Sequence, residues 1–168
     1  EKSAKYFASG ATRPYEYRKA ALEALYKAVS ENQEKLSAAL KADLNKSSHE
    51  AYMTETGIVL EEIRYLKKHL KKFMRVKRVS ASFSQFPASV KIIPEPYGTV
   101  LIMSPWNYPV QLTLVPLATA IAAGNAVVLK PSAYSPETGK CIEELLNKSL
   151  PEGLVLFVNG GRNEIQSL

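Results

Sequence analysis

Three short polar segments in the second half of the chain carry residue types that could do chemistry, and each follows an apolar run: S-P-W-N, K-P-S and N-G-G. Asn107, in the first segment, offers a neutral side-chain NH2 group that could stabilise a developing oxyanion. Lys130 and Ser132, in the second, can donate hydrogen bonds to a polar ligand such as a ribose. In the third, Gly160 and Gly161 allow the backbone to approach a ligand closely. Each residue alone is more typical of a plain turn, so the prediction of a ligand site depends on their joint position.

The elements around these segments predict that the segments meet. The apolar runs T-V-L-I-M (residues 99–103) and A-V-V-L-K predict strands buried on both faces, and G-L-V-L-F-V predicts a third strand. Between them lie an apolar helix that ends at Gly124 and a helix that opens at Ser135 and runs through Leu146. This order predicts parallel strands joined by right-handed crossovers, the first half of a doubly wound, Rossmann-like sheet. Ligands bind outside the carboxyl ends of the strands in such sheets, where all three segments lie.

The first half of the chain predicts helices. One begins at Pro14, with Thr12 as a candidate cap, and a second follows in E-N-Q-E-K-L-S-A-A-L-K-A-D-L-N-K. A third covers roughly residues 51–77, with Ser47 or Ser48 as its cap. The third helix has an apolar stripe at a spacing of three and four residues, formed by Val59, Ile63, Leu66, Leu70 and Phe73.

Residues 79–96 differ in composition from the helices before them. They are poor in helix formers and contain Pro87, Pro94 and Pro96, which predicts extended chain interrupted at the prolines. We therefore predict an α/β protein in three parts. These parts are an N-terminal helical region at residues 1–78, an extended segment at 79–96 and a partial βαβαβ unit at 97–168.

Composition excludes several classes of protein. No stretch is apolar over the about 20 residues that a membrane span needs. The single cysteine, Cys141, excludes an internal disulfide framework and a cysteine-based zinc cluster. His49 and His69 have no partners at ligand spacing, so we predict no metal site. The first residues, E-K-S-A-K-Y-F-A-S-G, lack the apolar run of a secretory signal, so we expect a cytoplasmic protein.

The formal net charge of +6 comes largely from a basic run at residues 64–78. A basic patch could bind nucleic acid or a membrane surface. The apolar stripe puts the lysines on the opposite side of the helix, and few aromatic residues are interleaved with them to stack on bases. We therefore interpret the run as a solvated helix face. We expect no nucleic-acid partner, and nothing in this portion indicates membrane association.

The usual fingerprints of nucleotide binding are absent from the sequence: it has neither G-x-G-x-x-G after a strand nor a P-loop. From its residues alone, the chain is an α/β ligand-binding half-domain whose ligand stays open. The motifs add more. Residues 105–132 closely resemble the aldehyde dehydrogenase superfamily through P-W-N-Y-P, through A-x-x-A-G-N-A-V-V-x-K-P-S and through their spacing. The resemblance covers almost the whole chain and is greatest to the class 3 branch, which includes fatty-aldehyde dehydrogenases.

The resemblance implies oxidation of an aldehyde to a carboxylic acid with NAD or NADP, and it implies roles for the three segments. Asn107 would help to hold the oxyanion of the thiohemiacetal. The backbone of its turn would lie along the cofactor, the lysine of K-P-S would bond the adenosine ribose, and the glycine-rich turn would pack near the adenosine. Residues and resemblance together give the cofactor-binding candidates Ser104, Pro105, Trp106, Lys130, Ser132, Gly160 and Gly161. The segment 79–94 would correspond to the family's oligomerisation strands, so we expect a homodimer.

Two departures from the family pattern matter. Ala133 stands where many members have a Glu that bonds the ribose 2′-hydroxyl, so we expect dual or NADP-leaning use. The family's nucleophilic cysteine, its general-base glutamate and its pyrophosphate-binding turn lie beyond Leu168, and a helical Cys141 is no substitute. We therefore expect the N-terminal, cofactor-binding portion of an aldehyde dehydrogenase. Alone it should be inactive and should bind NAD(P) weakly or not at all.

Two other hypotheses belong to different classes. In the first, the chain is a non-catalytic, self-associating assembly module whose residues 79–94 pair with the sheet edge of another chain. In the second, it is a basic nucleic-acid binder, which predicts DNA affinity that falls with salt.

Overall fold

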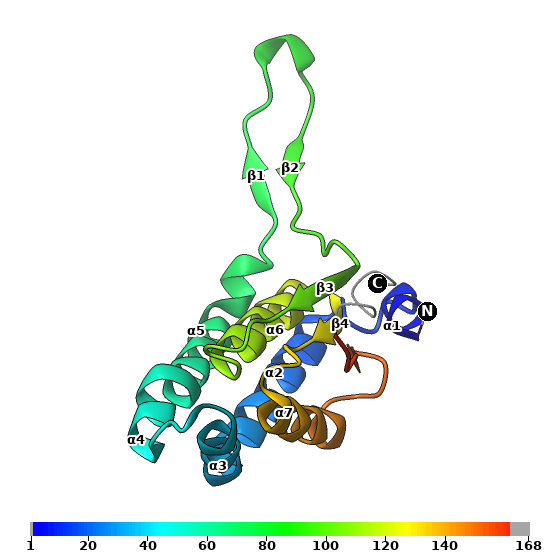
Figure 1. Cartoon of the computed structure of the whole chain (residues 1–168). Helices are drawn as coiled ribbons and strands as arrows, with labels where there is room; N and C mark the ends of the chain where they lie inside the picture. The colour runs from blue at the N-terminus through cyan, green and yellow to red at the C-terminus, as the bar shows by residue number, and fades with distance from the viewer. Residues whose placement is uncertain (1, 162–168) are drawn as a thin grey trace.

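The computed structural model describes residues 2–161 and contains a helical body, a three-stranded parallel sheet and a projecting hairpin (Figure 1). The sheet has the order β3-β4-β5, which confirms the predicted parallel α/β fold. The helices are α1 (Lys2–Ala8), α2 (Tyr15–Glu31), α3 (Gln33–Leu44), α4 (Ser48–Ala51), α5 (Gly57–Phe73), α6 (Gln111–Ala123) and α7 (Pro136–Ser149). The strands are β1 (Lys77–Val79), β2 (Val90–Ile92), β3 (Thr99–Met103), β4 (Ala126–Lys130) and β5 (Val155–Phe157).

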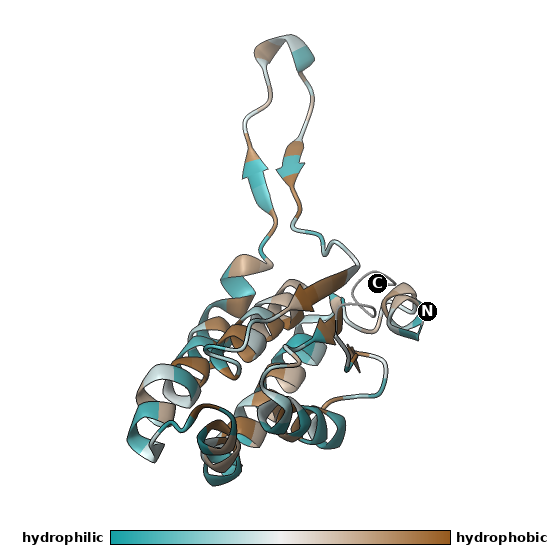
Figure 2. Cartoon of the chain, viewed as in Figure 1, coloured by the Kyte–Doolittle hydropathy of each residue, from teal (hydrophilic) through white to brown (hydrophobic). Residues whose placement is uncertain are grey.

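The core joins the N-terminal helices to the sheet. Helix α6 packs between the sheet and helices α2 and α5, and α7 packs on α2 and α3. One buried cluster contains leucines from all of these helices, together with Val127 and Leu129 of β4. Figure 2 shows β3 and β4 as hydrophobic over most of their length, whereas α5 and α7 alternate between hydrophobic and hydrophilic residues. The division into three parts stays a prediction.

Helix α6 ends where the sequence predicts, at Gly124. This residue has a φ of +90°, a left-handed conformation that side chains rarely adopt. A Cβ at this position would lie 2.5 Å from the guanidinium carbon of Arg18. That buried guanidinium donates to the carbonyl oxygens of Thr12 (3.0 Å) and Ala122 (3.2 Å), so it ties the end of α6 to the start of α2.

The start of α2 differs in one detail from the prediction. The helix begins at Tyr15, directly after Pro14, as expected. Thr12 is not its cap, because its buried hydroxyl has no hydrogen-bond partner in the part of the chain that the structure describes. The main-chain oxygen of Thr12 accepts from Arg18 instead.

The third predicted helix is interrupted. Ser47 caps its start and accepts from the N–H of Glu50 at 3.2 Å, as predicted. A π-helical turn, η1 (Tyr52–Thr56), then separates α4 from α5, and α5 ends at Phe73 rather than at residue 77. Four members of the predicted stripe are buried, but Phe73 is 45% exposed and its ring lies 6.1 Å from that of His69. The stripe therefore leaves the core between Leu70, which is fully buried, and Phe73, the last residue of α5.

Burial on both faces is wrong for β3. Exposure alternates along this strand, with Leu101 at 44% and Met103 at 57%. Val100 and Ile102 pack against the buried cluster, whereas Leu101 and Met103 on the opposite face stay exposed although β3 contacts both α6 and α1. The prediction holds for β4, the central strand, of which four of five residues are buried.

Residues 79–94 are extended, as predicted. Strands β1 and β2 pair antiparallel, from Lys77 opposite Ile92 to Val79 opposite Val90, and carry the short 3-10 helix η2 (Phe83–Gln85) between them. The hairpin stands away from the body (Figure 1). Its large apolar side chains are exposed, with Phe83 at 95% and Phe86 at 82%.

Candidate functional site

The three polar segments leave the sheet at the same edge. Strands β3 and β4 pair up to Met103 opposite Lys130, and the N–H of Ser104 then donates to the Lys130 carbonyl at 3.1 Å. On the other side of β4, the N–H of Val158 donates to the Leu129 carbonyl at 2.9 Å. S-P-W-N, K-P-S and N-G-G therefore follow the carboxyl ends of three adjacent parallel strands, as the sequence predicts.

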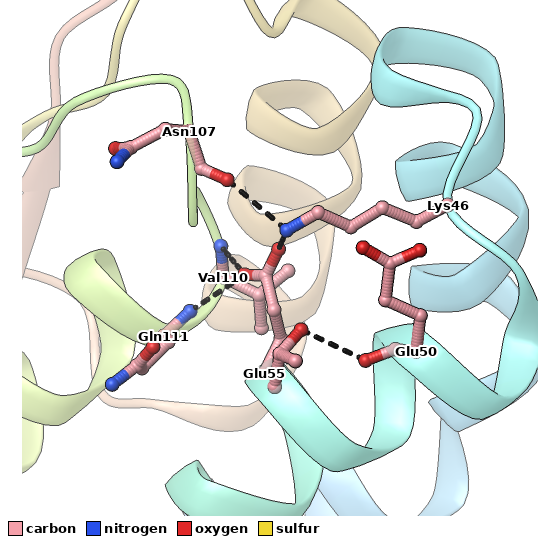
Figure 3. Close-up of polar contacts among 7 residues, drawn as sticks. Lys46, Glu50, Glu55, Asn107, Val110 and Gln111 are labelled. Atoms are coloured by element: carbon pink, nitrogen blue, oxygen red, sulfur yellow. Dashed lines mark hydrogen bonds and ion pairs between the residues drawn. The ribbon is translucent and has the colours of Figure 1, made fainter.

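The first segment is anchored at both ends, and its middle is exposed. The Ser104 side chain is buried and accepts a hydrogen bond from the Thr113 hydroxyl of α6 at 2.6 Å. Pro105, Trp106 and Asn107 are exposed, with Trp106 at 51%. In Figure 3 the side chain of Asn107 points away from the residues that hold its backbone. Among residues 2–161, no hydrogen-bond partner satisfies this amide, so it is available to a ligand.

A buried ion pair that sequence reasoning missed holds this turn (Figure 3). The Lys46 ammonium donates to Glu55 Oε1 at 2.6 Å and to the carbonyl oxygen of Asn107 at 3.0 Å. Glu55 Oε2 accepts from the N–H groups of Val110 (2.8 Å) and Gln111 (3.0 Å). The side chains of Lys46 and Glu55 are 9% and 0% exposed, so both charges depend on each other and on the turn for their partners.

The sequence contains one signal for this pair. Glu55 stands four residues before Val59, so it continues the apolar stripe of α5 by one turn. A carboxylate on a core-facing stripe needs buried partners, because an unpaired charge in the core is strongly unfavourable. No comparable signal marks Lys46, which follows the left-handed C-cap Asn45 of α3.

The second and third segments line one small pocket. Its volume is about 350 Å³, and Ser132, Ala133, Asn159 and Gly160 lie in its wall. Helix α7 completes the pocket with residues that include Lys140 and Glu143. The structure thus brings Ser132 and Gly160 together, and Gly161 follows directly. Asn107 is not in this wall; it stands at the neighbouring strand end.

Lys130 differs from the simple donor that the sequence predicts. Its side chain is buried, the residue being 4% exposed, and its ammonium donates to the carbonyl oxygen of Pro131 at 3.0 Å. The Ser132 hydroxyl accepts from the N–H of Tyr134 at 3.2 Å. The polar side chains of Lys130 and Ser132 therefore have hydrogen-bond partners within the loop that follows β4.

A carboxylate from helix α3 accepts hydrogen bonds from the first N–H groups of helix α7. Asp43, at the end of α3, accepts from the N–H groups of Glu137 (3.2 Å) and Thr138 (2.7 Å). The predicted opening residue Ser135 precedes the helix, but its buried hydroxyl has no hydrogen-bond partner within the described range. Sequence reasoning missed Asp43, because its two partners lie more than 90 residues away.

Cys141 lies on α7 and faces helices α2 and α3, away from the edge of the sheet. Burial raises the pKa of its thiol, and the nearby carboxylate of Glu144 raises it further. At neutral pH the thiol is therefore protonated and a poor nucleophile. Among the described residues, no group of three or more His, Cys, Asp or Glu side chains could hold a metal ion, and no helix is long and apolar enough to cross a membrane.

These features define a class of protein: an α/β protein with polar groups gathered at the carboxyl edge of a parallel sheet, the edge at which sheets of this kind bind ligands. Comparison with known proteins specifies it further. The chain matches the aldehyde dehydrogenase family over residues 1–168, and it belongs to that family.

Individual relatives agree with this assignment. An aldehyde dehydrogenase of Craterostigma plantagineum is 40% identical over 162 residues, which are 96% of this chain and 34% of that protein. Aldehyde dehydrogenase family 3 member B1 of Bos taurus is 44% identical over 158 residues, 94% of this chain and 34% of the relative. A solved structure of the substrate-bound state of Staphylococcus aureus AldH superimposes with a TM-score of 0.96 at 38% identity, over 99% of this chain and 36% of that one. The chain thus spans about a third of the length of these relatives.

Proposed function

We propose that the chain is the cofactor-binding, N-terminal part of an NAD(P)-dependent aldehyde dehydrogenase that oxidises aldehydes to carboxylic acids. The observation that carries the proposal is the family match over residues 1–168, in a chain whose Asn107 amide is exposed and unpaired at the carboxyl edge of the sheet. A neutral amide held there can donate to an oxyanion as negative charge develops on it, and it needs no reorganisation to do so.

The residues after β4 and β5 fit the adenosine half of a dinucleotide. The pocket wall offers the Ser132 hydroxyl and, at Gly160, backbone without a side chain. The Lys130 ammonium would exchange its bond with the Pro131 carbonyl for one with a ribose hydroxyl. The backbone of Ser104, Pro105 and Trp106 would lie along the cofactor. NAD or NADP, when bound, supplies the hydride acceptor; the residues of this chain bind it and orient the carbonyl.

The wall of the pocket also supports use of NADP. Ala133 is exposed in the wall and brings no carboxylate towards a 2′-phosphate. The acidic residue of the wall, Glu143, accepts a hydrogen bond from the Asn159 side chain at 2.8 Å. We therefore propose dual or NADP-leaning specificity, which titration of the full-length enzyme with each cofactor tests. A strong preference for NAD would contradict it.

The 168-residue chain by itself is proposed to be inactive. Its single cysteine has a raised pKa and faces away from the sheet edge, so it cannot form the thiohemiacetal at Asn107. Turnover of an aldehyde by the purified chain would contradict this. The cytoplasmic location also stays a prediction.

The test of the function is the variant Asn107→Ala in the full-length enzyme that carries this sequence. We expect kcat for aldehyde oxidation to fall by about 10²–10³-fold, the usual effect of removing one oxyanion donor, with an unchanged Kd for the cofactor. Asn147→Ala, on the exposed side of α7, is the matched control and should keep the parent kcat. An Asn107→Ala enzyme with the parent kcat would exclude the proposed role.

The hairpin favours a second function, self-association. Phe83, Phe86 and Ile92 are exposed apolar side chains on the hairpin, and both strands are edges that a second chain could extend. In the aldehyde dehydrogenase proposal the hairpin forms the homodimer; in the alternative, assembly is the whole function. Light scattering and cofactor calorimetry on the full-length protein distinguish them, because association without NAD(P) binding supports only the alternative.

A further inference from the structure

We propose that Lys46 and Glu55 are positioning residues for catalysis: they hold the backbone around Asn107 so that its side-chain amide stays aimed at the reacting carbonyl. The proposal rests on the proposed function of Asn107. It assigns a role in the reaction to Lys46, in the connection between α3 and α4, and to Glu55, in the π-helical turn η1, which are both far from the turn in sequence. The π-helical turn η1 is the device that places Glu55.

The pair holds the turn on both sides of Pro109. Lys46 bonds the carbonyl of Asn107 before the proline, and Glu55 bonds the N–H groups of Val110 and Gln111 after it. Proline has a fixed φ, so fixing the residues before and after it leaves the segment little freedom. The Asn107 side chain projects from this fixed backbone and has no hydrogen-bond partner of its own among residues 2–161.

Every N–H of the Lys46 ammonium has a partner, and both oxygens of Glu55 accept hydrogen bonds. The Lys46 ammonium has three N–H donors and three acceptors: Glu55 Oε1, the Asn107 carbonyl and the face of the Tyr108 ring, whose centroid is 4.1 Å away. Glu55 accepts from Lys46 through one oxygen and from two backbone N–H groups through the other. The two charges cancel, so the turn is fixed without a net charge beside the developing oxyanion.

Stability of helix α6 alone does not explain this arrangement. A carboxylate at its N-terminus would suffice, as Asp43 suffices for α7. The bond from Lys46 to the Asn107 carbonyl satisfies none of the unpaired N–H groups of α6, and burying the ammonium has a large desolvation cost. What that bond adds is a fixed orientation of the peptide that carries Asn107.

The π-helical turn η1 sets the position of Glu55. The N–H of Gly57 donates to the carbonyl of Tyr52, five residues earlier, so η1 contains one more residue than an α-helical turn. A Cβ at position 57 would lie 2.7 Å from that carbonyl oxygen, a distance at which the turn has to open. Gly57 therefore allows the irregularity that brings Glu55 against the start of α6.

The first experiment removes the pair without changing net charge. We expect Lys46→Met/Glu55→Gln, in the full-length enzyme, to lower kcat by about 10–100-fold, the range caused by small misplacements of a catalytic group. The cofactor Kd should stay within twofold of the parent. The matched control is Lys67→Met/Glu23→Gln, which removes another Lys–Glu pair, between α5 and α2 and away from the turn. It should keep the parent kcat.

A double-mutant cycle separates positioning from general stability. In an Asn107→Ala background, removal of the pair should lower kcat no further, because the group that it positions is gone. An equal loss in both backgrounds, or a parent-like kcat in the first experiment, would overturn the proposal. Gly57→Ala keeps both charges and should give the same pattern, so the test survives if the double variant does not fold.

Crystal structures decide the proposal even if the function is wrong. If the unsubstituted full-length protein oxidises no aldehyde, the proposed function fails, and the positioning is then judged from the Asn107 amide. We expect that amide to move by about 1 Å or more in the variants. An unmoved amide would overturn the inference on its own.

Discussion

The connection from β3 to α6 and the connection from β4 to α7 meet the same structural requirement in different ways. Each leaves the carboxyl edge of the sheet and enters a helix whose first N–H groups need acceptors. In both cases the helical body supplies a carboxylate: Glu55 for α6 and Asp43 for α7. Glu55 is fully buried and paired with Lys46, whereas Asp43 is half-buried and has no basic partner among residues 2–161.

The polar side chains of the two connections differ accordingly. The β3–α6 turn is held from outside, so Asn107 can keep its side chain exposed and unpaired. In the β4–α7 connection, by contrast, the polar side chains bond within the loop: Lys130 is folded onto the Pro131 carbonyl, and the Ser132 hydroxyl accepts from the N–H of Tyr134. The turn that presents the reacting group in the proposed function is thus fixed by a distant ion pair. The loop that we propose to bind adenosine would rearrange when its ligand binds.

The largest effect is expected from a substitution that removes the carboxylate holding the β3–α6 connection. Glu55→Ala leaves the buried Lys46 ammonium and two N–H groups without their carboxylate, so the free energy of unfolding should fall by about 3–5 kcal/mol. Urea denaturation followed by circular dichroism measures it. Lys46→Met/Glu55→Gln should be less destabilised, since no unpaired charge remains. A loss below about 1 kcal/mol for Glu55→Ala would mean that the pair is solvated.

The next prediction separates the chemistry of the two connections. Lys130→Met should raise the Kd of the full-length enzyme for NAD(P) by about 10–100-fold, as expected from the loss of a charged hydrogen bond. At saturating cofactor, kcat should change little. For Asn107→Ala we expect the reverse, a lower kcat with an unchanged Kd for the cofactor. If Lys130→Met lowers kcat and leaves the Kd for NAD(P) at the parent value, Lys130 acts at the reacting carbonyl. The two connections would then not differ in the chemistry that they serve.

The sequence predicted the elements that depend on local chemistry. Strand β3 coincides with the run T-V-L-I-M and strand β4 with the run A-V-V-L-K, and helix α6 stops at Gly124. These predictions succeed because apolar patterning and a left-handed glycine act within a few residues. Parallel pairing followed from the alternation of strands and helices. The meeting of the three polar segments at one edge then followed from the geometry of parallel sheets.

What the sequence did not predict depends on partners distant in the chain. Lys46 and Glu55 meet the β3–α6 turn across 61 and 55 residues, and no local pattern encodes such a meeting. The exposure of Leu101 has the same origin, because an apolar run does not reveal which faces of its strand other elements will cover. The sequence does not reveal the π-helical turn η1 either. Glu55 stands four residues before Val59, so the spacing of the α5 stripe continues through the turn as if it were an α-helix.

A smaller effect is expected at the second connection. Asp43→Ala removes the acceptor of two N–H groups at the start of α7 but leaves no buried charge behind, so the free energy of unfolding should fall by about 1 kcal/mol. Asp43→Asn should recover most of it. The same urea titration as for Glu55→Ala gives the comparison. Equal losses for the two variants would show that the ion pair adds nothing beyond a cap.

The smallest effect concerns Cys141, which lies on the same helix, α7, as the wall of the pocket proposed for adenosine but faces the helical body. Burial raises the pKa of its thiol, so at a given pH it contains less thiolate than a free cysteine and should react more slowly with iodoacetamide. Because the 168-residue chain has one cysteine, mass spectrometry of this chain reports that residue alone. The same chain in urea is the control and should react several-fold faster, and both rates should rise with pH. Equal rates would mean that the thiol is accessible in the native protein, and the argument that Cys141 is inert would lose its basis.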